Sequence, residues 1–418
     1  MAVVETVSRY RWVILTLSLL CQISAALAGQ VLAPLAPLFQ PELGLSKAEV
    51  GLFSIATFAG AWSVLLIAGS ITDRVGIRRM MSLGQFAAGG LLLSMSTMNS
   101  AVQAWLVMFA AGIARGMVFP GSTKAVMEWF SPTTRATAMG LKQTGAPVGG
   151  IITAATLPAI ALVLGWRSAI AVAGAVIIAA GVAAALVYRD PPDRRQKHEA
   201  RPGILAGMRD VLRNRRLWLF GSIAMTFVTA QQALLTYLAL YFKDVVLVES
   251  VPDERARIVA AGGYLAICQV GGVMGRVLWG WVSDRLLQRR RVLAMAIIGI
   301  LAAATFLLVA GIDPGYPGWL LSAVVFACGI TAVSWNGVYH ALVTETAGRQ
   351  FAGTGVGMSL TMVESGSMIG PPIFGLIADL TGSYRPAWVF LACLSIAGSL
   401  VAVAAARERF RLSSETVV

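Results

Sequence analysis

The chain has 418 residues, of which 57% are hydrophobic and 13% are charged, whereas about a quarter of the residues in an ordinary soluble domain carry a charge. This composition excludes a soluble globular protein, because a globule of this length could not bury so much apolar surface. The net charge of +13 leaves nucleic-acid binding open until the basic residues have been located along the chain.

The apolar residues form long blocks, and they do not alternate over about ten residues as the strands of a transmembrane barrel do. Crossing the ~30 Å hydrocarbon core of a bilayer takes about 20 helical residues. We expect membrane helices, in chain order, at 11–38, 46–68, 80–98, 101–127, 135–163, 167–188, 216–242, 256–281, 292–311, 317–343, 351–377 and 384–406. The first block is too long for the core of a signal peptide and lacks a cleavage site, so we expect it to remain as the first helix. The sequence therefore predicts an all-α membrane protein with twelve transmembrane helices.

One charged stretch divides these helices into six plus six. It lies between the sixth and seventh helices and includes Asp190-Pro191-Pro192-Asp193-Arg194-Arg195. We expect an N-terminal six-helix bundle at 1–188, a cytoplasmic linker at 189–215 and a C-terminal six-helix bundle at 216–418.

Most of the basic residues fall in termini and loops that share one side of the membrane. The richest stretches are 74–79, 189–216, 285–291 and 407–411, whereas the other side holds isolated residues such as Lys47 and Arg385. This bias predicts a protein of a bacterial-type inner (plasma) membrane with both termini and the linker on the cytoplasmic side. The positive charge therefore indicates topology and contact with anionic membrane lipid, and nucleic acid is not an expected partner.

The two halves repeat a short loop segment. The first copy, after the second helix, contains Gly69, Asp73, Arg74, Gly76 and Arg78, and the second copy, after the eighth helix, contains Asp284 and Arg285. The first copy resembles the loop signature between helices 2 and 3 of the major facilitator superfamily, and the second resembles its counterpart between helices 8 and 9. This resemblance covers nearly the whole chain, and it implies two pseudo-symmetric six-helix bundles that transport by alternating access around a midplane site.

The loop signature is expected to gate and stabilise the fold and not to touch substrate. Glycine permits a tight turn and close helix approach, and the arginines anchor to the cytoplasmic leaflet. In the second copy Leu287 stands where the first has Gly76, so we expect a looser turn there.

Charged side chains inside membrane helices are costly and mark functional sites by default. The predicted helices contain four basic residues and one clearly deep acidic residue, namely Arg115, Lys124, Lys142, Arg276 and Glu364. This excess of positive charge needs a compensating negative charge, and a small anionic substrate is the natural candidate.

Arg276 is the first candidate for binding that anion. It precedes Asp284 by eight residues, which puts it about 12 Å above the cytoplasmic end of its helix. It resembles the substrate-binding arginine in helix 8 of the monocarboxylate and oxalate transporters of the superfamily, and a guanidinium binds a carboxylate bidentately. The alternative is an arginine that pairs with backbone carbonyls or a neighbouring acid.

The other interior cations have open roles. Arg115 resembles the helix-4 arginine common in the superfamily, and substrate contact and a structural or coupling role are both possible. Lys124 either extends to the cytoplasmic interface or faces the cavity, and Lys142 faces either the cavity or a neighbouring helix. Ser122 and Lys124 occupy the stretch where organic-anion uptake systems often carry a glutamate, so the usual helix-4 proton carrier is missing.

Glu364 is the candidate for proton coupling, because a carboxyl group near mid-depth can carry a proton. It is otherwise a permanent partner of Arg276 or Lys142. Oxalate exchangers carry a lysine in helix 11, so this chain departs from their pattern. His340 is the next candidate, since imidazole titrates near neutral pH.

Neutral polar side chains complete the predicted cavity, although such residues more often bridge helices than bind ligands. The predicted substrate-binding residues among them are Gln231, Gln232, Tyr237, Asn336 and His340, with Gln22, Gln30, Thr236 and Tyr339 as further polar groups. Cys21, Cys268, Cys328 and Cys393 lie in apolar spans without metal-ligand spacing. We therefore expect no metal and no cofactor.

The sequence favours a secondary active symporter that takes up a small organic anion, a carboxylate, with protons. The alternative is a proton-coupled drug or metabolite exporter, because Gly145, Pro147, Gly149 and Gly150 resemble the glycine–proline motif in helix 5 of drug antiporters. A membrane receptor is disfavoured by the short predicted termini. An enzyme is not expected, because the sequence has no paired catalytic carboxylates and no nucleophile–base spacing. We expect a monomer.

Overall fold

The computed structural model describes residues 2–98, 100–130, 135–189, 215–288 and 290–415. The described residues form helices and connecting turns without any strand, and eleven of the helices are long and apolar enough to cross a membrane. The expected span at 80–98 corresponds to helix α4 (Ile77–Met95), which is not one of those eleven. The all-α membrane fold is confirmed. The proposed linker at 189–215 lies, apart from its two ends, outside the described residues.

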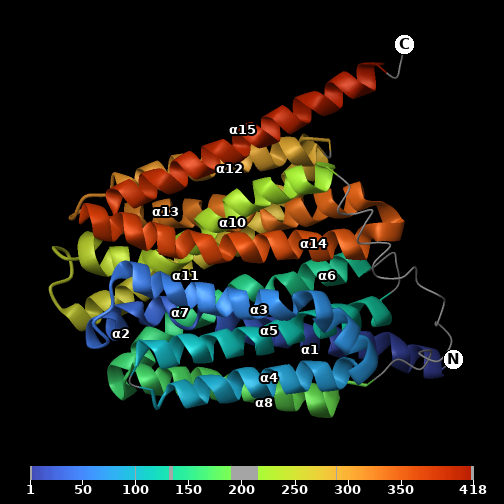
Figure 1. Ribbon diagram of the computed structural model, residues 1–418, viewed down its shortest axis with the longest axis horizontal. Helices are drawn as coiled ribbons and strands as arrows, with labels where there is room; N and C mark the ends of the chain where they lie inside the picture. Colours follow the sequence, from blue (N-terminus) through green and yellow to red (C-terminus); the bar gives the residue numbers. More distant parts are fainter. Residues whose placement is uncertain (1, 99, 131–134, 190–214, 289, 416–418) are drawn as a thin grey trace. The chain divides into compact units, whose positions relative to one another are not determined.

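The chain divides into two compact units. Unit 1 comprises residues 1–44 and 53–200, and unit 2 comprises residues 45–52 and 201–418. The helices of unit 1 (Figure 1) are α1 (Ala2–Gln30), the short η1 (Ala33–Leu35) and α2 (Ala36–Glu42), most of α3 (Lys47–Val75), α4, α5 (Ala101–Trp129), α6 (Arg135–Gln143), α7 (Gly145–Leu164) and α8 (Trp166–Val187). Helix α4 packs against α5 and α8, and α1 packs against α5 and α7.

Unit 2 contains the remaining helices. They are α10 (Arg215–Tyr241), the π-helical turn η3 (Phe242–Val246), α11 (Glu254–Trp281), the π-helical turn η4 (Val282–Leu286), α12 (Arg291–Ala310), α13 (Gly318–Cys328), the π-helical turn η5 (Gly329–Val333), α14 (Asn336–Thr381) and α15 (Arg385–Glu415). Helix α10 packs against α14, α12 packs against α15, and α11 packs against both α13 and η5. The helix expected at 317–343 is therefore interrupted at η5.

Helix α14 differs from the prediction of separate helices at 317–343 and 351–377. It continues through the predicted loop and is 46 residues long, or about 69 Å, which is enough for two membrane spans. The connecting residues 344–350 contain no proline, so nothing in them obliges the helix to end.

The two copies of the repeated loop turn differently. Gly76 has φ of 94° and separates α3 from α4, a backbone conformation that glycine adopts without a steric penalty. In the second copy the π-helical turn η4 precedes Leu287, whose φ is −96°, and Gln288 takes the positive φ of 49°. The left-handed position therefore lies one residue beyond the site equivalent to Gly76.

The first turn of α3 is held within unit 2 by Asp379 at the end of α14. The Asp379 carboxylate accepts hydrogen bonds from the backbone N–H groups of Lys47 (3.2 Å) and Ala48 (2.8 Å), and Lys47 Nζ lies 3.6 Å from Asp379 Oδ1. A carboxylate at a helix N-terminus satisfies N–H groups that have no partner within the helix.

Tyr384 supports the same region. Burial, reinforced by the negative charge of Asp244, raises the pKa of Tyr384. The hydroxyl therefore keeps its proton and donates to Asp244 Oδ2 at 2.8 Å.

Glycines allow helix backbones to touch inside each unit. An ideal Cβ built at Gly89 of α4 would lie 2.6 Å from the carbonyl oxygen of Gly174 in α8, and one built at Gly174 would lie 2.7 Å from the oxygen of Gly89. In unit 2, a Cβ at Gly329 would lie 1.9 Å from the oxygen of Cys268. Small residues permit this packing between membrane helices, where dispersion and not the hydrophobic effect holds helices together.

The pair Gly89 and Gly90 tests this packing. We expect Gly89→Ala to destabilise the protein by about 1–3 kcal/mol, because the methyl group has no room beside α8. Gly90→Ala is the matched control, since an ideal Cβ there meets nothing within 4 Å. Thermal unfolding in detergent should show a lower melting temperature for the first variant only. Equal melting temperatures for the two variants would contradict the packing account.

Candidate functional site

A polar cluster lies where α10 meets the start of α14 in unit 2. Gln231 of α10 accepts two hydrogen bonds at Oε1, from Trp335 Nε1 at 2.8 Å and from Asn336 Nδ2 at 3.2 Å. Gln231 is 7% exposed and Trp335 is 1% exposed. The structure thus brings together two residues that the sequence predicted, Gln231 and Asn336. It adds Trp335, which the sequence reasoning missed.

His340 and Arg276 extend this cluster. His340 lies one turn beyond Asn336 on α14, and Arg276 of α11 is close enough for its charge to act on the imidazole. An ideal Cβ on Gly337 would lie 3.9 Å from the backbone oxygen of Arg276, which places α11 beside the start of α14. Both side chains are partly buried. We call Gln231, Arg276, Trp335, Asn336 and His340 the unit 2 cluster.

Trp335 and Asn336 of the cluster follow directly after η5, where the helix is interrupted. A π-helical turn leaves backbone carbonyls without their usual helical donors. The carbonyl of Ile330 accepts hydrogen bonds from Trp279 Nε1 at 2.8 Å and from the Ser334 hydroxyl. The irregular backbone is therefore satisfied by side chains of unit 2 and stays stable at membrane depth.

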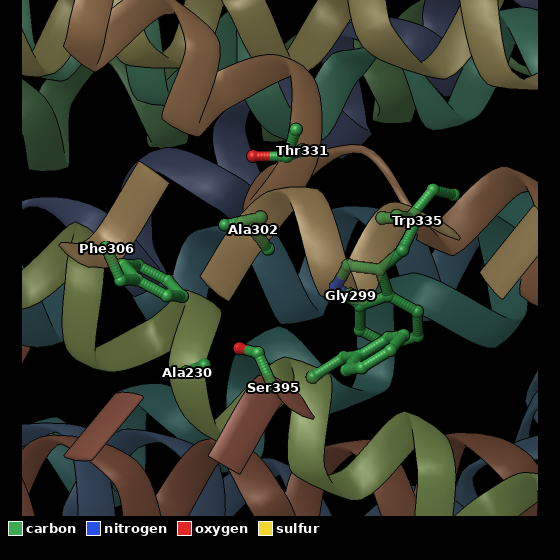
Figure 2. Close-up of a pocket in the computed structure, with 10 residues that line it drawn as sticks. Ala230, Gly299, Ala302, Phe306, Thr331, Trp335 and Ser395 are labelled. Atoms are coloured by element: carbon green, nitrogen blue, oxygen red, sulfur yellow. The ribbon is translucent and has the colours of Figure 1, made fainter. Parts of the chain in front are cut away.

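A small cavity lies next to the cluster, beside the Trp335 ring (Figure 2). Its lining includes Phe227, Phe306, Thr331 and Ser395. The hydroxyl of Ser395 donates to Leu391 O at 2.8 Å, and that of Thr331 donates to Ala327 O at 2.8 Å. None of the ten described residues lining the cavity is charged, so this cavity has no group suited to an anion.

Lys142 forms the second candidate region, in unit 1. Its side chain is completely buried, and Nζ donates to Thr123 Oγ1 of α5 at 2.9 Å. The ammonium also lies 4.3 Å from the centre of the Phe119 ring. Within the part of the chain that the structure describes, Lys142 forms no ion pair with an acidic residue. Its described polar neighbours are this hydroxyl, the aromatic face and the buried thiol of Cys21 in α1, which lies close enough for the two charges to interact.

The other interior cations of unit 1 have different surroundings. The Arg115 guanidinium lies 5.1 Å from the centre of the Phe58 ring, and its side chain passes beside Gly29 of α1. Lys124 Nζ lies 3.9 Å from Glu128 Oε1, one turn along α5. The sequence reasoning missed Glu128, although its spacing of four residues from Lys124 is a recognisable signal for a helical ion pair.

Tyr237 makes its described contacts away from the unit 2 cluster. The Tyr237 hydroxyl donates to the backbone oxygen of Lys47, and its ring stacks on Phe374 with centroids 4.7 Å apart. Gln232 and Glu364 are partly buried on α10 and α14.

The loop signature contributes structural contacts. Arg78 Nε donates to Ala185 O at 2.5 Å, and Arg74 and Arg285 are exposed. The surroundings of Gly69 and of the Asp73 side chain lie outside the described part. In the second copy, Arg291 Nη1 lies 2.6 Å from Asp284 Oδ1 and Arg291 Nη2 lies 3.2 Å from Glu345 Oε1. The sequence reasoning did not single out Arg291, because both of its acidic partners come from other elements.

The glycine–proline segment of α7 packs closely against α1. An ideal Cβ at Gly149 would lie 2.6 Å from Ile23 O, and one at Gly145 would lie 3.0 Å from Gln22 Cβ. Close helix packing therefore explains these glycines without any reference to drug export.

Residues 18–371 match the sequence profile of the Major Facilitator Superfamily. The chain belongs to this superfamily. It is 26% identical, over 88% of its length and 87% of the relative's, to the probable sulfoacetate transporter of Cupriavidus necator. It is 28% identical, over 86% of its length and 84% of the relative's, to the probable galactarate/D-glucarate transporter of Bacillus subtilis. Among solved structures, the nucleoside transporter NupG covers 94% of this chain with 98% of its own, at a TM-score of 0.75 and 15% identity. This member of the superfamily is thus a multi-pass membrane transporter and not an enzyme.

Substitution of Lys142 tests whether an acidic group stabilises its buried ammonium. We expect Lys142→Met to melt no lower than wild type, because the change keeps most of the apolar side chain and removes a buried ammonium that has no acidic partner among the described residues. Arg291→Met is the control, since it leaves Asp284 and Glu345 without their shared cation, and it should lower the melting temperature. A loss of several degrees in Lys142→Met would mean that an acidic group stabilises this lysine.

Proposed function

We propose that this transporter imports a small organic anion, a carboxylate, together with protons across the inner membrane by alternating access. The observation that carries the proposal is the complete burial of Lys142 beside Thr123 and Phe119, with no ion pair to an acidic residue in the described part of the chain. An ammonium in such surroundings is costly unless it gives up its proton or an anion compensates it. An anionic substrate supplies that charge during the transport cycle.

Two further observations support an anionic substrate. In unit 2 the charge of Arg276 acts on His340, while Gln231 and Asn336 contribute amide groups nearby. Guanidinium and N–H donors are the groups that bind carboxylates. The names of the two relatives, for sulfoacetate and for galactarate and D-glucarate, are those of organic anions.

The test is uptake by purified protein in proteoliposomes. The panel contains labelled mono- and dicarboxylates and sulfonates, with neutral analogues as controls, in the presence and absence of an inward proton gradient. We expect saturable uptake of at least one anion, with weaker uptake by Lys142→Met than by the control Lys124→Met. Transport of cationic drugs without any anion uptake would replace the proposal by the exporter alternative.

Arg276 is the proposed anchor of the substrate carboxylate. Arg276→Lys keeps the charge and loses the planar fork, so we expect affinity to fall roughly ten- to hundredfold, as the loss of a charge-assisted hydrogen bond implies. Arg276→Ala should bind more weakly still. Binding is measured on folded, monodisperse protein, with Arg291→Lys as the arginine control outside the cluster. Unchanged affinity in Arg276→Ala would exclude this arginine as the anchor.

Glu364 is the proposed proton carrier. Glu364→Gln cannot release a proton, so we expect it to lose accumulation driven by a proton gradient while it keeps substrate counterflow. The two assays use the same proteoliposomes, which makes the comparison independent of protein content. Normal accumulation by this variant would move the proton site to another group, with His340 the next to test.

The proposal includes the orientation of the protein in the membrane. The distribution of Lys and Arg along the sequence supports cytoplasmic termini and contact with membrane lipid, and the proposed transporter is a monomer. Single cysteines introduced near Arg195 and Arg290 should react with an impermeant reagent from the cytoplasmic side, and those near Lys47 and Arg385 from the opposite side. The reverse labelling pattern would overturn this orientation.

A further inference from the structure

The side-chain amide of Gln231 has two chemically different ends, and its surroundings determine which end faces where. Oε1 accepts hydrogen bonds, and Nε2 donates two. An indole N–H only donates, so the end of the Gln231 amide that faces Trp335 Nε1 at 2.8 Å is the oxygen. Trp335 therefore fixes the orientation of the amide.

Asn336 agrees with this assignment independently. Its Nδ2 lies 3.4 Å from the backbone oxygen of Val333, and a carbonyl oxygen only accepts. The same Nδ2 therefore donates to Gln231 Oε1 at 3.2 Å. Two donors of fixed polarity thus converge on one oxygen, and a flipped Gln231 amide would face both of them with an N–H group.

The Trp335 ring is itself held in place. It is 1% exposed, its centroid lies 6.0 Å from that of Phe227 and 5.5 Å from that of Tyr339, and it follows the irregular backbone of η5. A buried ring with aromatic neighbours on both α10 and α14 has little freedom to turn its N–H away.

With the oxygen engaged, the Gln231 NH2 group has no hydrogen bond to any residue that the structure describes. It offers two donors and no acceptor in a cluster that also contains the positive charge of Arg276. Such a group matches an acceptor oxygen of an anion, and it does not match a substrate group that itself donates.

We propose that Trp335 is a positioning residue that fixes the Gln231 amide with its NH2 group as a donor to an acceptor oxygen of the anionic substrate. The inference rests on the proposed function and adds a determinant of selectivity to it. With Trp335 in place, the cluster prefers a carboxylate oxygen over the NH2 group of the corresponding carboxamide. Without the indole N–H, only Asn336 Nδ2 still holds the Gln231 oxygen, so the amide reverses more readily and can then accept from that NH2 group.

The test compares two tryptophans with the same substitution. Trp335→Phe keeps an aromatic ring and removes the N–H that faces Gln231. Trp279→Phe is the matched control, because Trp279 Nε1 also donates a hydrogen bond inside unit 2, a partly buried one, but to Ile330 O. The probes are sulfoacetate, galactarate, D-glucarate and the mono- and dicarboxylates of the uptake panel, and the best-binding carboxylate is paired with its carboxamide.

The measured quantity is the ratio of carboxylate affinity to carboxamide affinity. We expect this ratio to fall about tenfold in Trp335→Phe, as the loss of one oriented hydrogen bond implies, and to stay at the wild-type value in Trp279→Phe. Gln231→Glu is the second variant, in case the first does not fold. It places an acceptor toward the substrate, so it should lose the carboxylate and keep the carboxamide.

The outcomes separate the two proposals. An unchanged ratio in Trp335→Phe, with both affinities lowered equally, would mean that Trp335 only stabilises the fold, and it would overturn the inference alone. A Gln231→Glu variant that still prefers the carboxylate would do the same. Wild-type protein that binds none of the anions would overturn the proposed function and this inference with it.

Discussion

The structure depends on one constraint: hydrocarbon supplies no hydrogen-bond partner, so every polar group at membrane depth needs one from the chain or from its cargo. The carbonyl of Ile330, freed by the π-helical turn η5, receives the indole N–H of Trp279 and the hydroxyl of Ser334. At the second copy of the repeated loop, Arg291 pairs with Asp284 and Glu345. Lys142 differs from both, because its described neighbours are a hydroxyl, a ring and a thiol and include no carboxylate, and that difference is the basis for proposing an anionic substrate.

Close helix contact is the second requirement, and glycine provides it. Gly89 and Gly174 bring the backbones of α4 and α8 together, and Gly329 brings η5 against α11 at Cys268. This packing holds α11 and the η5 region close enough for Trp279 to reach the carbonyl of Ile330. The polar cluster is thus built on a rigid support, and its side chains are positioned by neighbours on three helices, α10, α11 and α14.

Features that depend on a local sequence pattern could be predicted from the sequence alone. Hydropathy predicted the all-α membrane fold, and the glycine rule predicted the tight turn at Gly76. The pair of Lys124 and Glu128 was available from helical spacing and was missed. Trp335 could not have been found in this way, because an indole in an apolar span is ordinary, and only the approach of Gln231, 104 residues away, reveals its polar contact. The two acidic partners of Arg291 and the continuity of α14 likewise depend on tertiary packing.

The π-helical turn η5 has a consequence for the register of everything that follows it. A π-helical turn contains about one residue more than an α-helical turn, and each residue of an α-helix advances by about 100° around the axis. The additional residue therefore rotates Trp335 and Asn336 by roughly a quarter turn relative to the face on which Gly329 packs against Cys268. The face of η5 that carries Gly329 stays packed on α11, while Trp335 and Asn336, on the adjacent face, present their side chains to Gln231 of α10. The number of residues between Gly329 and Trp335 thus determines the geometry of this cluster as much as the types of those residues do. A deletion there would preserve a helix but turn the Trp335 and Asn336 side chains away from Gln231.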